Sequence, residues 1–154
     1  MRRSPLGPVN EPRALLIPAS VGEVIDKITI LQLKREHLQQ QAQLQPVSDE
    51  LAALEAVLER HGLGYPVGAL AELGGDLAAV NRQLWQVEDA LRRCEQSGSF
   101  GAEFVALARS VYQHNDRRAA IKRRINERSG SLLMEQKIYP NYPGSPGDAA
   151  SSCA

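Results

Sequence analysis

One helical seam constrains the fold of this chain more than any other feature. Between positions 70 and 94, apolar residues recur without a break at alternating steps of three and four. The eight positions are Leu70, Leu73, Leu77, Val80, Leu84, Val87, Leu91 and Cys94. This spacing puts every member on one side of a helix and is typical of helices that pack on other helices. The segment therefore predicts a long bundle or coiled-coil helix, with Gly74-Gly75 as the point where a kink or break is expected.

Three further segments carry helical signals. Residues 20–23, Ser-Val-Gly-Glu, form a capping-box pattern, so a first helix is expected over about 21–45, stopping before Pro46. A short second helix is expected from Ser48 or Asp49 to Arg60, and a last one from near Gly101 to about Ser129.

These segments predict an all-α fold, an antiparallel helical bundle with two or three long helices and short connecting helices. The composition agrees, because the 154 residues include 43% hydrophobic but only 5% aromatic side chains. We expect a Pro-rich N-terminal arm over residues 1–19, a single helical domain over 20–139 and a disordered C-terminal tail over 140–154.

The formal net charge of zero conceals an uneven distribution. Residues 47–100 carry four cations and nine carboxylates, whereas residues 101–139 carry eight cations and four carboxylates. The acidic and basic segments could neutralise each other, or the last helix could present a basic surface. A nucleic-acid partner is not expected, since no aromatic residues are interleaved with the cations of the last helix to stack on bases.

The sequence predicts a cytoplasmic protein without a membrane segment. No apolar run reaches the length that crosses a bilayer, and the Pro-rich start forms no signal peptide. The two cysteines, Cys94 and Cys153, are isolated, and the histidines lack metal-ligand spacing. We therefore expect neither a metal nor a cofactor. No phosphate-binding loop or nucleophile motif favours an enzyme.

Polar residues that fall on the helical seams are the candidates for a site, because an ionic group inside a bundle must be paired or must bind something. Arg35 lies on the seam of the first helix, and Arg118 on that of the last, with Asn115 and Lys122 in the row beside it. The first helix adds Glu23, Asp26 and Lys27, and the third adds Trp85 and Glu88 on one face with Asn81.

Three interpretations of these residues stay open. The first is a buried salt-bridge network, with Asp26 or Glu88 against Arg118 or Lys122, that fixes the helix register. The second is a small cleft in which the cations bind a carboxylate or a phosphate. In the third, the helices rotate and the side chains face water.

The chain resembles an uncharacterised bacterial family of small helical proteins. The matching stretches are residues 17–31, 81–91, 100–126 and 135–139. The resemblance implies an all-α fold without an established activity, and an association with glycosyltransferase and surface-polysaccharide genes. It also draws attention to Asp89, Arg109 and Asp116, beside the polar residues already named.

A weaker resemblance links Ile25-Asp26, followed by apolar steps and a cation, to helical chorismate mutases, which bind a dicarboxylate between Arg and Lys. The chain departs from that pattern, because its Arg follows the Asp too early and Pro18 stands where an upstream Arg belongs.

Two functional hypotheses follow. The first is a non-enzymatic accessory or interaction protein, binding a protein partner or a second copy of itself, with surface-polysaccharide metabolism as the pathway that the resemblance suggests. The alternative is an anion-binding helical cleft, or an enzyme acting on a phosphorylated sugar or a carboxylate. The residues assigned to the candidate site are Glu23, Asp26, Lys27, Arg35, Trp85, Glu88, Asn115, Asp116, Arg118 and Lys122.

Overall fold

The computed structural model describes residues 14–136 and residue 138, and within them the fold is all-α. Its helices are α1 (Val21–His37), α2 (Gln41–Arg60), α3 (Ala71–Ser97) and α4 (Ala102–Ser129). The predicted tail over 140–154 and most of the predicted arm lie outside the described residues. No helix in the described part of the chain is both long and apolar enough to cross a membrane.

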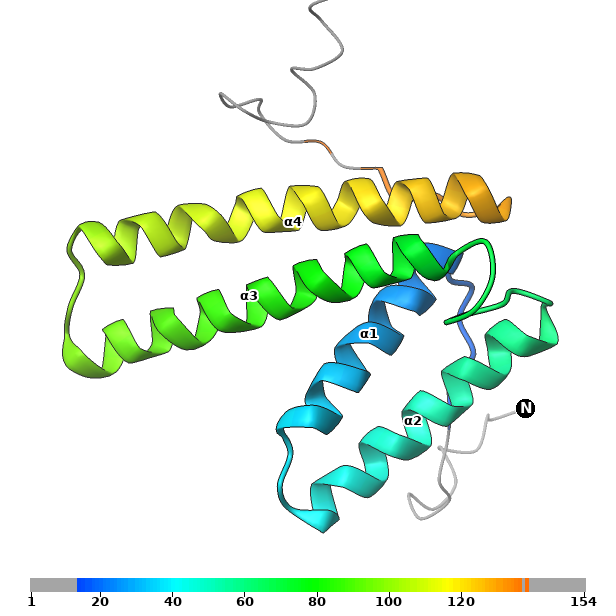
Figure 1. The fold of residues 1–154 in the computed structure, drawn as a ribbon, viewed down its shortest axis with the longest axis horizontal. Helices are drawn as coiled ribbons and strands as arrows, with labels where there is room; N and C mark the ends of the chain where they lie inside the picture. Colours follow the sequence, from blue (N-terminus) through cyan, green and yellow to red (C-terminus); the bar gives the residue numbers. More distant parts are fainter. Residues whose placement is uncertain (1–13, 137, 139–154) are drawn as a thin grey trace, which may run out of the picture.

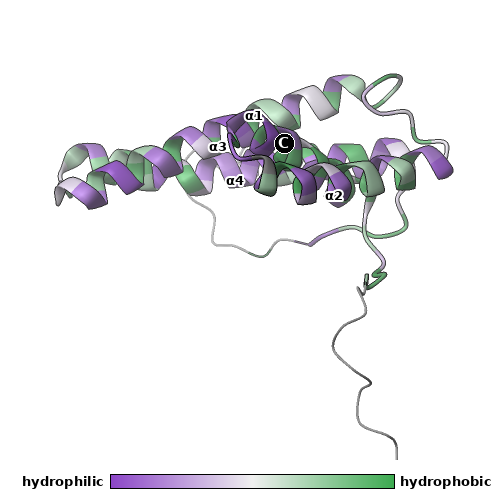
Figure 2. Ribbon diagram, turned by 90° about the horizontal axis from the view of Figure 1, so that it is seen from below, coloured by the Kyte–Doolittle hydropathy of each residue, from purple (hydrophilic) through white to green (hydrophobic). Residues whose placement is uncertain are grey.

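The helices form two hairpins, α1–α2 and α3–α4, which are joined through the packing of α1 against α3 and α4. Helices α3 and α4 run antiparallel along their whole length, and α1 lies obliquely against one half of them (Figure 1). Helix α1 contacts all three other helices, whereas α2 contacts α1 alone among the helices. Figure 2 shows the remaining half of the α3–α4 hairpin extending beyond α1 and α2.

The core forms where three helices meet. Ile25 and Ile28 of α1, Leu77 and Val80 of α3, and Ile125 of α4 each have an exposed fraction of 0%. These residues include two members of the predicted seam of α3. Burying such side chains contributes roughly 1.5–3 kcal/mol each, which makes this junction the most stable part of the molecule.

The first helix ends earlier than predicted, and the second begins earlier. Helix α1 stops at His37, Leu38 is extended, and α2 contains Pro46 as its sixth residue. A proline so close to the start of a helix removes one backbone hydrogen bond and can be tolerated. Because the chain reverses at Leu38, before α2, Leu51 and Leu58 can pack into the core, where they are 2% and 3% exposed. Tertiary packing therefore outweighs the local signal of the proline.

The chain does not break at Gly74-Gly75, since α3 is continuous from Ala71 to Ser97. A Cβ atom at Gly74 would collide with the ring of Tyr65, which packs directly on the backbone of α3. The absence of a side chain at Gly74 therefore lets the ring of Tyr65 pack against α3. The helix ends are marked by Gly98 and Gly130, both with left-handed backbone angles that favour glycine.

Candidate functional site

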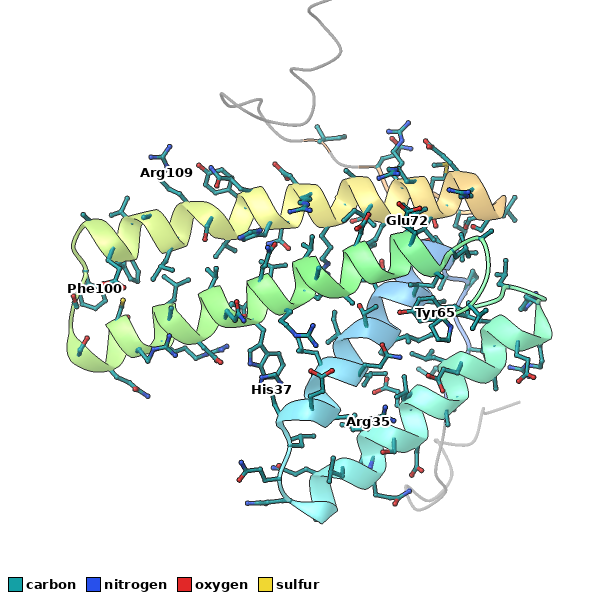
Figure 3. All side chains as sticks on the ribbon, in the orientation of Figure 1. Arg35, His37, Tyr65, Glu72, Phe100 and Arg109 are labelled. Carbon is teal, nitrogen blue, oxygen red and sulfur yellow. The ribbon has the colours of Figure 1, made fainter. Side chains whose placement is uncertain are left out.

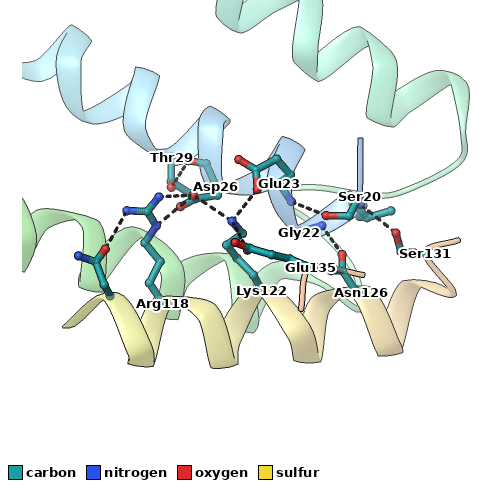
Figure 4. Close-up of polar contacts among 12 residues, drawn as sticks. Ser20, Gly22, Glu23, Asp26, Thr29, Arg118, Lys122, Asn126, Ser131 and Glu135 are labelled. Atoms are coloured by element: carbon teal, nitrogen blue, oxygen red, sulfur yellow. Dashed lines mark hydrogen bonds and ion pairs between the residues drawn. The ribbon is translucent and has the colours of Figure 1, made fainter. Parts of the chain in front are cut away.

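A polar network fills the crossing of α1 and α4, and Asp26 lies at its centre (Figure 4). The Asp26 side chain is 2% exposed. Its Oδ2 accepts a hydrogen bond from Arg118 Nε at 3.1 Å and forms an ion pair with Arg118 Nη2 at 3.0 Å. The hydrogen bond joins a guanidinium to a carboxylate, and such charge-assisted bonds are roughly twice as strong as neutral ones.

Helix α3 joins the network through Asn81, which is 5% exposed. Its Nδ2 donates to Asp26 Oδ1 and to Thr29 Oγ1, both at 2.8 Å. Thr29 Oγ1 in turn donates to the backbone oxygen of Asp26 at 2.8 Å. Both carboxylate oxygens of Asp26 therefore have partners, and one buried residue links three helices.

Lys122 carries the second cation of the network, and its side chain is 9% exposed. Its Nζ lies 2.6 Å from Glu23 Oε2, 3.3 Å from Glu135 Oε2 and 3.8 Å from Asp26 Oδ2. Glu135 belongs to the segment after α4, which returns along that helix (Figure 4). Three carboxylates from two segments thus surround this one buried ammonium group.

The start of α1 approaches α4 unusually closely. The backbone N–H of Gly22 donates to Asn126 Oδ1 at 2.6 Å, and that of Val21 donates to Ser131 Oγ at 3.2 Å. A Cβ atom on Gly22 would stand 2.6 Å from the backbone oxygen of Lys122, so only glycine fits without a shift. Ser20 Oγ accepts from the N–H of Glu23 at 3.2 Å, as the capping pattern predicts.

The structure brings together five of the ten candidate residues: Glu23, Asp26, Asn115, Arg118 and Lys122. Asn115 is attached through its Oδ1, which accepts from Arg118 Nη1 at 3.3 Å. The three helices therefore carry a connected group of acidic, basic and amide side chains.

Of the other five candidates, Lys27, Arg35, Trp85 and Glu88 lie outside this network. Lys27 pairs with Glu50 of α2, and Glu88 pairs with Arg92 one turn along α3. The ring of Trp85 lies 4.7 Å from that of His37, and Asp116 is half-buried on α4. Arg35 is exposed near the end of α1 (Figure 3), because Leu33 is the last buried residue before the helix ends.

Several members of the network were not among the candidates. The sequence places Asn81 on one face with Trp85 and Glu88, and Asn126 in the row of Asn115 and Lys122, whereas Thr29 and Gly22 give no distinct signal of a site. Both asparagines are polar residues at or beside inward positions, since Asn81 directly follows the seam residue Val80.

The network has the chemistry of a structural contact. Its two cations face three carboxylates, so its charges are already compensated. Among the described residues, no group of three or more His, Cys, Asp or Glu side chains could hold a metal ion. Cys94 is a free thiol, but it is buried at the other end of α3.

One protein-family model matches the chain and covers residues 16–153. Its description is that of a family of unknown function. The comparison with curated proteins and the comparison with solved structures each give no match. The geometry of the described residues is therefore the basis for assigning a role.

Proposed function

We propose that this chain, which belongs to the family of unknown function DUF6165, is a helical interaction protein that pairs with a second copy of itself. The pairing surface is the part of the α3–α4 hairpin that extends past α1 and α2, residues 85–113, termed here the distal hairpin; its first residues, Trp85 and Glu88, still border α1. A cytoplasmic location and a link to surface-polysaccharide metabolism remain predictions from the sequence.

One observation carries the proposal: the apolar seam of α3 continues past the point where its cover ends. Leu73, Leu77 and Val80 are 0–2% exposed, whereas Val87 and Leu91 further along are only partly buried. Within residues 85–113, all of which the structure describes, Cys94 is the single buried side chain. The apolar seam of α3 therefore extends beyond the buried core of the protein.

Exposed apolar side chains at the end of the hairpin extend this surface. Phe100 and Val105 are 54% and 51% exposed, and Phe100 lies at the turn farthest from α1 and α2 (Figure 3). The rings of Phe100 and Phe104 meet edge to face, with centroids 5.3 Å apart. Exposed apolar side chains gathered on one part of a protein surface favour an interaction site there.

A second copy fits this surface better than an unrelated partner. Two antiparallel helices form half of a four-helix bundle, and a second hairpin of the same length and spacing completes it. The distal hairpin holds four carboxylates and three arginines, and the whole chain has a formal net charge of zero, so two copies would not repel each other strongly. A two-fold axis would place the same patch on both sides.

The alternative of an enzyme acting on a phosphorylated sugar has weaker support. Arg118 and Lys122, the cations that would bind such an anion, already pair with Asp26, Glu23 and Glu135. A phosphate would have to displace or share these carboxylates, at a cost in charge repulsion.

Sedimentation equilibrium of the full chain tests the proposal. A monomer has a mass of 16.9 kDa, and we expect the apparent mass to rise toward twice that value as the concentration increases. A monomer mass at every concentration would overturn self-association, even if other partners bind.

A further inference from the structure

An open groove lies where α1, α3 and α4 meet, on the side of Arg118 that Asp26 does not cover. The lining residues that decide its chemistry are Leu33, Lys34, Trp85, Glu88, Asn115 and Arg118. Four of these are candidate site residues from two helices, and they converge here although only Asn115 and Arg118 belong to the polar network.

The guanidinium of Arg118 is held in a fixed orientation at the base of the groove. Its Nε donates to Asp26 Oδ2, its Nη2 forms an ion pair with the same oxygen, and its Nη1 donates to Asn115 Oδ1 at 3.3 Å. An arginine carries five N–H groups, so these contacts leave N–H groups over for a ligand. The side chain is 29% exposed and lines the groove. An arginine that is already ordered loses less entropy when it binds a ligand.

One wall of the groove is apolar. Trp85 stacks against His37 at an interplanar angle of 30°, which fixes the position of the indole. Leu33 is 4% exposed and contributes aliphatic surface from α1. The groove thus combines a rigid cation with an aromatic wall, as expected of sites that are mostly apolar with few polar groups.

The charges around the groove limit what it can hold. Arg118 faces Asp26, while Lys34 and Glu88 are both exposed at the groove, so the positive and negative side chains balance. A dianionic phosphate would add two negative charges to this balanced set. A carboxylate adds one, and its two oxygens match the fork of a guanidinium.

We propose that this groove binds a small carboxylic acid with a planar or apolar body, its carboxylate on Arg118 and its body against Trp85. This proposal makes no use of self-association, since Leu33, Lys34, Asn115 and Arg118 lie outside the distal hairpin and Trp85 and Glu88 lie at its boundary with α1.

Trp85 itself provides the readout, since it is the sole tryptophan of the chain. Titration of the full chain with phenylacetate is expected to change Trp85 fluorescence in a saturable way, with a Kd on the order of 1 mM. Phenylacetamide, which has the same body without the charge, and inorganic phosphate, which has charge without the body, are expected to bind at least about tenfold more weakly. The absence of saturation, or equal binding of either control compound, would overturn the proposal.

Two substitutions and a control test whether phenylacetate binds in this groove. Arg118→Lys keeps a cation beside Asp26 but removes the fork, and we expect about a tenfold loss of affinity for phenylacetate. Lys34→Met removes an exposed cation that lines the groove without touching the core, so it tests the site even if Arg118→Lys does not fold. The matched control is Lys27→Met, because Lys27 lies on the same helix but pairs with Glu50. Equal affinities of the Lys34→Met and Lys27→Met variants for phenylacetate would contradict binding in this groove.

Discussion

Two nitrogens of Arg118, Nη2 and Nε, lie 3.0 Å and 3.1 Å from the same oxygen of Asp26, Oδ2. This contact connects α4 to α1 across the core. Asn81 holds the other oxygen from α3. The arrangement satisfies a carboxylate that is almost wholly removed from water, with contacts from both α3 and α4. The consequence is that Asp26 sets how α1 crosses the α3–α4 hairpin.

Replacing Asp26 by Asn should lower the free energy of unfolding by about 3–5 kcal/mol, because it removes the buried carboxylate that pairs with Arg118, whereas Lys122 keeps Glu23 and Glu135. Urea unfolding followed by circular dichroism measures the change. Glu50→Gln is the control, since the Lys27–Glu50 pair is about half exposed and is worth roughly 0–1 kcal/mol. Equal losses in the two variants would show that the Asp26 contacts contribute no more than a surface pair.

Gly22→Ala should destabilise the fold by about 1–3 kcal/mol, although alanine normally favours a helix over glycine. The added Cβ would stand 2.6 Å from the backbone oxygen of Lys122 and 2.9 Å from Asn126 Oδ1. Thermal unfolding compares it with Gly75→Ala in α3, where nothing lies within 4 Å of the new Cβ. Gly75→Ala should raise the free energy of unfolding by up to about 1 kcal/mol. If Gly22→Ala raises it as well, α1 can move away from α4 at little cost in free energy.

Stability should also fall in strongly alkaline solution because of Tyr65. Burial, and then the negative charge of Glu55, raise the pKa of the Tyr65 hydroxyl above its usual value. The folded protein therefore keeps this proton above about pH 10, where the unfolded chain releases it, so the free energy of unfolding decreases as the pH rises through that range.

Unfolding by urea at a series of pH values tests this. Tyr65→Phe has no hydroxyl to ionise and should lose less stability than the unchanged protein between about pH 9 and pH 11. Parallel pH profiles for the two proteins would exclude Tyr65 as the source of the effect.

The sequence predicted the helical class because its strongest signals are local. The seam from Leu70 to Leu84 is buried as the spacing indicates, and Ser20 caps α1 as its capping box predicts. The end of α1 could not be predicted from local signals. Pro46 predicts a helix end just before it, but the chain already reverses at Leu38, so that Leu51 and Leu58 reach the core. The stabilisation from burying these two residues depends on residues far away in the sequence.

The candidate site was predictable in part for the same reason. Arg118 lies on the apolar seam of α4 and Lys122 in the row beside it, and periodicity alone identifies such positions, whereas Asp26 lies off the seam of the first helix and is marked only by its charge. Arg35 continues the same pattern but is exposed, because α1 ends only two residues later. The role of Gly22 depends on how closely two helices cross, and no pattern within one helix encodes that distance.

The most direct test of the proposed function compares two exposed valines. Val105, on the distal hairpin, is 51% exposed, and Val67, in the loop before α3, is 76% exposed. Val105→Asp would bury two carboxylates in a symmetric apolar interface, whereas its position in the first turns of α4 tolerates a negative charge in the monomer. Sedimentation equilibrium should show the dimer weakened by about tenfold or more for Val105→Asp and unchanged for Val67→Asp. Equal dimerisation of both variants would contradict pairing through the distal hairpin.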